Sequence, residues 1–244
     1  MAAIRTSAGT GRYVAGENDI VVTTAAGWVG DLPPLIYCHG AGENAAIVWA
    51  DSDERQLLMA LGQDFCVGMA DLGGQLFGND PHRTRIGQHK TYLNGGRWNA
   101  TGSVVLVGSS MGAIGALGYT LVNPANVLGV ACIIPALDIQ DVYEATTPAG
   151  TVPPLIDAAY GGAYNDAVHG PDYSPVQFAA ELDPDIPVHL FAADNDTAAR
   201  PATVNAFLAA RPQTAITWVG NLEHTDAAIM AAMPSVLEFV SQFA

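Results

Sequence analysis

The sequence comprises 244 residues, half of them apolar, and this suits one domain with a sizeable hydrophobic core. Nine Lys and Arg residues against 24 Asp and Glu residues give a formal net charge of −15. Because no basic cluster is present, we expect neither nucleic acid nor an anionic membrane surface to be a partner.

Targeting and redox signals are sparse in this chain. The N-terminal stretch MAAIRTSAGTGRYVAG lacks the continuous apolar core of a signal peptide, and no run of 18 apolar residues suggests a membrane span. The three cysteines, Cys38, Cys66 and Cys132, lie in or beside apolar strand-like runs. Their placement predicts buried, reduced thiols rather than a disulfide or a nucleophile.

Short apolar strand-like runs alternate with helical patterns along most of the chain. In chain order, the expected elements are strand 19–25, strand 34–39, helix 46–62, strand 64–70, helix 80–93, strand 103–108, helix 111–122, strand 127–136, strand 186–193, helix 201–211, strand 215–220 and helix 225–243. In the first helix, Leu57, Leu58 and Leu61 form an apolar stripe. The second helix is expected to open at Asp80, with Pro81 at its first position.

Continuous apolar strands that alternate with helices predict an α/β fold, with a mostly parallel twisted sheet covered by helices on both faces. Residues 137–185 interrupt this alternation, because they are rich in Tyr, Pro and Asp and have weak periodicity. We interpret them as an insertion or lid above the sheet. The expected organisation is therefore a single domain over residues 1–244 that contains this insertion.

A serine between two glycines lies where a predicted strand passes into a predicted helix. Ser110 stands in VGSSMG, directly after an all-apolar strand and before a segment of small residues. Gly108 and Gly112 allow a sharp turn and a close approach of strand and helix, which forces the Ser110 hydroxyl out above the sheet. There the helix N-terminus favours developing negative charge. The pattern predicts a nucleophile; the alternative is an ordinary glycine-rich turn with a capping serine.

A nucleophilic serine needs a base, and in this arrangement the base follows it in the chain. His224 stands in NLEHTD, between the last predicted strand and the last predicted helix, where a loop can return its imidazole to Ser110. His169 is the other histidine at a plausible loop position, whereas His189 lies within a strand. His224 is therefore the predicted base.

The acid that orients the base is expected just after the strand at 186–193. The segment LFAADND offers Asp194 and Asp196 there. We favour Asp196, because the loop then runs directly into TAARP and its helix. Asp138, which follows the strand at 127–136, is a further candidate.

The segment IYCHGAGENA places small residues just after a strand, where backbone can approach a substrate closely. Its Ala41 N–H is the first choice as an oxyanion donor, and the Met111 N–H, next to the nucleophile, is the second. His39 is expected to fix this loop by hydrogen bonding rather than to act as a base.

The segments YCHGAG, VGSSMG, LFAADND and NLEHTD resemble those of the α/β-hydrolase superfamily, over residues 19–243 or so. The resemblance implies a sheet of about eight strands with the insertion after the sixth, and no metal or organic cofactor. It also implies a set of catalytic groups by position, namely Ser110, Asp196 and His224, with Ala41 and Met111 at the oxyanion. The chain has Ala192 and Ala193 where many members have His-Gly, which leaves Asp194 open as the acid.

The expected function is that of a serine esterase, which cleaves a small-molecule or polysaccharide-borne carboxylic ester through an acyl-enzyme. Thioester hydrolysis or acyl transfer, and a catalytically silent binding or structural module of the same fold, are the alternatives. The chain is also similar to hydrolases encoded in tail-gene regions of actinobacterial phages. The expected location is accordingly the cytoplasm or a virion, while substrate-binding residues and oligomeric state are not predicted.

Overall fold

The computed structural model describes residues 4–10, 18–24, 32–95, 102–145 and 151–244. Residues 146–150 of the expected insertion and residue 25 of the first expected strand lie outside this part of the chain. Among the described helices, none combines the length and the apolar character needed to cross a bilayer.

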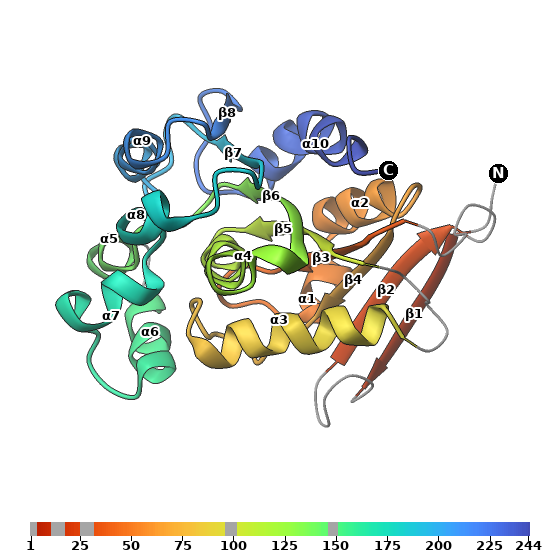
Figure 1. Ribbon diagram of the computed structural model, residues 1–244, viewed down its shortest axis with the longest axis horizontal. Helices are drawn as coiled ribbons and strands as arrows, with labels where there is room; N and C mark the ends of the chain where they lie inside the picture. The colour runs from red at the N-terminus through yellow and green to blue at the C-terminus, as the bar shows by residue number, and fades with distance from the viewer. Residues whose placement is uncertain (1–3, 11–17, 25–31, 96–101, 146–150) are drawn as a thin grey trace.

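An eight-stranded sheet runs through the centre of the molecule in the order β1-β2-β4-β3-β5-β6-β7-β8 (Figure 1). Its strands are β1 (Ile4–Thr10), β2 (Asn18–Thr24), β3 (Pro34–Cys38), β4 (Cys66–Ala70), β5 (Val104–Ser109), β6 (Val127–Ile133), β7 (Val188–Ala192) and β8 (Ala215–Trp218). The β1–β2 and β2–β4 pairs are antiparallel and all the others are parallel. The predicted mostly parallel sheet is confirmed. The unexpected strand β1 forms by pairing with β2, although its sequence IRTSAGT has no apolar run.

Helices cover both faces of the sheet, as predicted. One face packs against α1 (Ala45–Ala50), α2 (Ser52–Leu61) and α10 (Asp226–Ser241). The other packs against α3 (Asp80–Leu93), α4 (Met111–Val122), α8 (Pro175–Phe178) and α9 (Pro201–Ala210). The stripe of Leu57, Leu58 and Leu61 is fully buried on the first face, so burial of apolar area there fixes α2 to the sheet.

Two helix starts differ from the prediction because the side chain of a preceding residue caps them. The pattern predicted as one helix over 46–62 is two helices, since Asp51 is extended and its carboxylate accepts hydrogen bonds from two amides of α2. Helix α3 is capped by Asn79 rather than opened by Asp80, because the Asn79 side chain accepts from an amide in the first turn.

In its described residues, the segment between β6 and β7 forms four α-helices and a short 3-10 helix (Ala179–Glu181), where the sequence predicted an insertion. The α-helices are α5 (Ile139–Glu144), α6 (Val152–Tyr160), α7 (Asp166–Tyr173) and α8. Figure 1 shows them gathered on the side of the molecule opposite β1. Since β5, β7 and β8 are parallel, the loops that follow them emerge at one edge of the sheet, close to this insertion.

Candidate active site

Ser110 stands at a strained turn between β5 and α4. Its backbone has φ of 51° and ψ of −115°, a conformation that residues with a side chain rarely adopt. The Ser110 amide donates to the Ile133 carbonyl at 3.0 Å, and the Ser110 carbonyl accepts from the Ala136 amide at 3.2 Å. The end of β6 therefore holds the strained residue on both sides.

Gly108 and Gly112 are required by close backbone contacts around this turn. A Cβ on Gly112 would lie 1.9 Å from the carbonyl oxygen of Cys38, and a Cβ on Gly108 would lie 2.6 Å from that of Gly112. Backbone atoms cannot rotate away as a side chain can. The predicted close approach of strand and helix is confirmed, and it leaves the serine as the residue with a side chain at the point of the turn.

The structure brings Ser110, His224 and Asp196 into one hydrogen-bonded chain. His224 Nε2 lies 2.8 Å from Ser110 Oγ, and His224 Nδ1 lies 2.7 Å from Asp196 Oδ2. When Nδ1–H donates to the carboxylate, Nε2 carries a lone pair that faces the serine hydroxyl. Three loops at the same edge of the sheet, after β5, β7 and β8, thus bring together a serine hydroxyl, a carboxylate and an imidazole.

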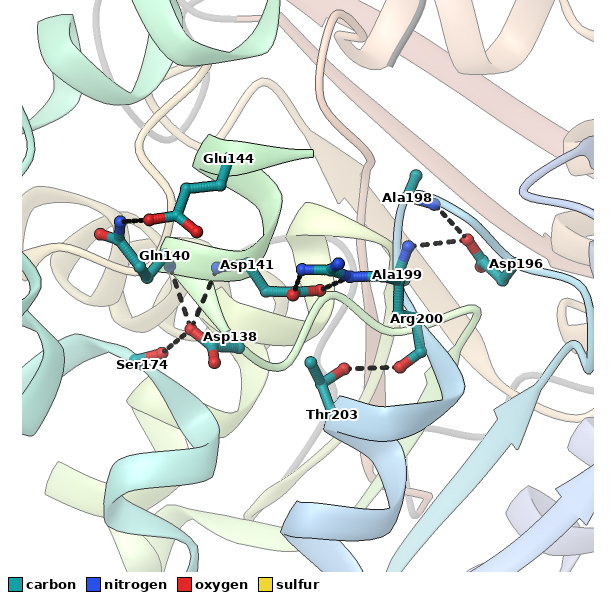
Figure 2. Close-up of polar contacts among 10 residues, drawn as sticks. All are labelled: Asp138, Gln140, Asp141, Glu144, Ser174, Asp196, Ala198, Ala199, Arg200 and Thr203. Carbon is teal, nitrogen blue, oxygen red and sulfur yellow. Dashed lines mark hydrogen bonds and ion pairs between the residues drawn. The ribbon is translucent and has the colours of Figure 1, made fainter. Parts of the chain in front are cut away.

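Hydrogen bonds within its own loop hold the Asp196 carboxylate in place. Its second oxygen, Oδ1, accepts hydrogen bonds from the Ala198 and Ala199 amides at 2.9 and 2.7 Å, as Figure 2 shows. The residue is 3 % exposed, whereas Asp194 is exposed and its amide donates to Gly220. The geometry therefore places Asp196, and not Asp194, beside the imidazole.

The other candidates for acid and base lie elsewhere. Asp138 caps α5, where its carboxylate accepts from the Gln140 and Asp141 amides (Figure 2). His189 contacts a threonine hydroxyl on β8, and His169 packs in α7 against tyrosine rings. Neither imidazole has a contact with Ser110 within the described residues.

A cavity of about 160 Å³ opens beside the serine. Ser110, His224, Ala41 and Met111 all line it. The rest of its lining is apolar and consists of Phe77, Ala136, Val142, Val152, Ala198 and Ala199. Across the described segments, neither the Ala41 nor the Met111 amide has a hydrogen-bond partner, so both can donate to a bound oxygen.

The loop that carries Ala41 is held by side chains from two segments. His39 bridges the carbonyls of Gly40 and Asp71, at 2.8 and 3.0 Å, which agrees with its predicted role in fixing the loop. The Gly40 amide donates to the Glu43 carboxylate at 2.6 Å. The loop is therefore tied down on either side of the candidate oxyanion donor.

The sequence did not predict that the segment DLGGQLFGND contributes to this site. Gln75 accepts from the Gly42 amide at 2.6 Å and donates to the Glu43 carbonyl at 2.9 Å. Phe77, with φ of 43°, lines the cavity. The sequence signal for these roles was the cluster of glycines alone, which marks an irregular loop but not its partners.

Two acidic side chains, Glu43 and Glu54, have raised pKa values and are not among the residues that line the cavity. Burial raises the pKa of Glu43, and the negative charges of Asp226 and Asp51 raise it further. Burial raises the pKa of Glu54 to about 8, and Glu54 accepts a hydrogen bond of 2.6 Å from the Tyr37 hydroxyl. These carboxyls hold protons more firmly than exposed ones do.

The thiols have no features of a nucleophile or of a metal site. Cys38, Cys66 and Cys132 are free and buried, as predicted. Burial raises the pKa of Cys38 and of Cys66 to about 12, so both remain protonated at neutral pH. Within the described residues, no three His, Cys, Asp or Glu side chains are grouped so that they could hold a metal ion.

No protein-family model and no curated sequence matches this chain. Among solved structures, esterase B from Lactobacillus Rhamnosis has a TM-score of 0.74 and 16% identity, with 98% of this chain and 85% of that chain covered. A ferulic acid esterase has a TM-score of 0.73 and 14% identity, with coverage of 100% and 99%.

A third structure, of a prolyl endopeptidase, has a TM-score of 0.67 and 20% identity over 99% of this chain. This chain spans 38% of that protein's length. The expected similarity to phage tail-region hydrolases stays a prediction. At such identities the matches report on architecture, and together with the strand order they establish that the chain has the α/β-hydrolase fold.

Proposed function

We propose that this protein is a serine hydrolase that cleaves carboxylic esters through an acyl-enzyme. The observation that carries the proposal is the hydrogen-bonded chain from Ser110 through His224 to Asp196, beside a cavity lined by Ala41 and Met111, whose amides have no partner in the described part of the chain. A binding module of the same fold would not need a strained serine, an oriented imidazole and a buried carboxylate in contact with one another.

In the first half-reaction, the Ser110 hydroxyl oxygen attacks the acyl carbon while His224 Nε2 takes its proton. Asp196 holds the imidazole in the required tautomer and stabilises its positive charge. The Ala41 and Met111 amides stabilise the oxyanion of the tetrahedral intermediate. The imidazolium then protonates the leaving alcohol oxygen as the ester C–O bond breaks, which leaves the acyl group on Ser110.

The second half-reaction repeats these steps with water. His224 takes a proton from a water molecule as its oxygen attacks the acyl carbon, and returns the proton to Ser110 Oγ when the carboxylic acid leaves. No cofactor takes part in either half-reaction as we propose it.

The size of the cavity favours a small acyl group. An apolar cavity of roughly 150 Å³ holds a benzene ring, and the cavity here measures about 160 Å³. A short aliphatic chain or a single aromatic ring fits this space, and the alcohol part of a small molecule or a polysaccharide remains outside. The esterases among the structures of similar fold support an ester as the bond that is cleaved.

Covalent labelling with a fluorophosphonate, together with turnover of p-nitrophenyl butyrate, tests the proposal. Ser110→Ala abolishes both signals while the protein stays folded by circular dichroism. Ser109→Ala is the matched control, because Ser109 is the preceding residue, ends β5 and is only 3 % exposed. The control keeps its labelling. Folded wild-type protein that neither reacts with the probe nor turns over esters would instead be a silent module.

A further inference from the structure

The acyl cavity has walls from two segments that are far apart in the sequence. Val142 of α5 and Val152 of α6 belong to the insertion. Ala198 and Ala199 belong to residues 193–200, which we call the acid loop because it carries Asp196. The width of the cavity therefore depends on how closely the insertion lies against the acid loop.

An ion pair joins these two walls. Arg200 Nε donates to Asp141 Oδ2 at 2.8 Å, and Arg200 Nη2 contacts the other carboxylate oxygen, so the pair is bidentate (Figure 2). Asp141 directly precedes Val142, and Arg200 directly follows Ala199. Each partner is thus the chain neighbour of a residue that lines the cavity.

Both ends of this ion pair are fixed to their own segments. On the insertion side, the Asp141 amide donates to Asp138, which also accepts a hydrogen bond from Ser174 at 3.5 Å. On the other side, the Arg200 carbonyl accepts from the Thr203 hydroxyl at 2.8 Å. Figure 2 shows these contacts as one continuous set. Movement of either partner would consequently be passed to the backbone of its wall.

The burial of the two side chains indicates a role in positioning more than in overall stability. The Asp141 side chain is 12% exposed and that of Arg200 is 48% exposed. A pair with one partner in water contributes little to folding. It nevertheless fixes a distance, because a bidentate contact restrains both position and orientation.

We propose that the Asp141–Arg200 ion pair is a clasp that determines acyl-group specificity, by holding Val142 against Ala199 so that short or single-ring acyl groups are selected. This inference rests on the proposed esterase function. Without the clasp, α5 separates from the acid loop and the cavity accepts longer chains. Short acyl groups then lose contacts with the walls, and their KM rises.

The test compares p-nitrophenyl butyrate with p-nitrophenyl octanoate on the full chain. In Arg200→Ala and in Asp141→Ala, we expect the ratio of kcat/KM for octanoate to that for butyrate to rise by about five- to tenfold, chiefly through KM. Arg200→Lys keeps the charge but not the bidentate contact, so its ratio should lie between those of the wild type and Arg200→Ala. The double swap of Asp141→Arg with Arg200→Asp returns the ratio toward that of the wild type.

Glu144→Ala is the matched control on the same helix. Glu144 accepts a hydrogen bond from Gln140 on the exposed side of α5 and has no contact with Arg200 in Figure 2. The control leaves the ratio unchanged. An equal shift in this variant would mean that any loosening of α5 widens the cavity, and would overturn the clasp.

Fluorophosphonate labelling of Ser110 in every variant separates the two proposals. Variants that label at the wild-type rate but keep the wild-type ratio overturn the clasp and leave the esterase function standing. Wild-type protein without labelling or turnover overturns both. If Asp141→Ala fails to fold, Arg200→Lys and the double swap still decide, because both keep a polar partner at each position.

Discussion

The serine turn and the insertion meet at one cavity, but different kinds of contact hold them. Around Ser110 the chain is fixed by backbone against backbone, with glycines at the two positions where no side chain fits. The insertion is attached by side chains: the Tyr160 hydroxyl donates to the Phe77 carbonyl at 2.8 Å, and Asn79 donates to the Ala159 carbonyl at 2.8 Å.

A further attachment shows the same character. Arg83 of α3 is buried, donates to the Asp172 carbonyl and stacks over the Tyr173 ring with its guanidinium 4.7 Å from the ring centroid. Such contacts can be exchanged one side chain at a time, whereas the serine turn cannot change without moving the sheet. The difference agrees with our proposal, in which the turn fixes the chemistry and the insertion determines which acyl group reaches it.

Glycine substitutions in the two regions give the largest contrast. Gly112→Ala places a methyl group 1.9 Å from the Cys38 carbonyl oxygen, so we expect loss of soluble folded protein or an activity loss above about a thousandfold. Gly162→Ala in the insertion meets no atom within 4 Å and serves as the control. For both variants, circular dichroism measures folding and turnover of p-nitrophenyl butyrate measures activity. Equal behaviour of the two variants would contradict a turn fixed by backbone contact.

Removal of the charge on the acid tests whether orientation of the imidazole matters as much as the geometry indicates. Asp196→Asn should lower kcat by about 10³- to 10⁴-fold with little change in fold, because the amide favours the wrong imidazole tautomer. Asp194→Asn, two residues away and exposed, should change kcat less than about twofold. Steady-state kinetics decide, and a larger loss in the Asp194 variant would reverse the assignment.

Glu54 lies in helix α2, outside the insertion, and its raised pKa predicts that the stability of the protein depends on pH. Its pKa in the folded protein is about 8, above that of an unfolded Glu, so the native state keeps a proton that the unfolded state has lost. The free energy of unfolding therefore falls as pH rises from about 4.3 to that value.

Glu54→Gln removes this contribution. In urea unfolding, the free energy of unfolding of the variant relative to that of wild type should increase by about 1–3 kcal/mol as pH rises from about 5 to about 8. Glu181→Gln, the same substitution at an exposed position, serves as the control. A gain that grows toward low pH instead would show that the carboxyl is stabilised in its charged form.

The smallest effect is expected in the insertion. Tyr160→Phe removes the hydrogen bond to Phe77 but keeps the ring, which contacts Tyr164 and His169 with centroids 5.2 and 4.8 Å away. We expect a loss of about 1 kcal/mol in unfolding free energy and a change in kcat/KM within about threefold. An activity loss of several hundredfold would show that the insertion, too, is fixed as rigidly as the turn.

The expectations that succeeded depended on short stretches of chain. The strand, the two glycines and the helix around Ser110 follow one another within a few residues, so local backbone geometry suffices to predict the turn. The position of the histidine between β8 and α10 also follows from the local order of strand, loop and helix, whereas its contact with Ser110 spans 114 positions. The helix predicted over 46–62 failed for an equally local reason, since capping by Asp51 divides it.

What the sequence determined by itself is the order of buried strands and helices and the position of the serine turn, because apolar periodicity and glycine spacing act between neighbours in the chain. The sequence favoured Asp196 as the partner of His224 but left Asp194 and Asp138 open, and the tertiary structure decided among them. It also decided that Asp141 meets Arg200 across 59 positions and that IRTSAGT pairs as a strand. Such partners are selected by burial and by distant backbone, which no local pattern encodes.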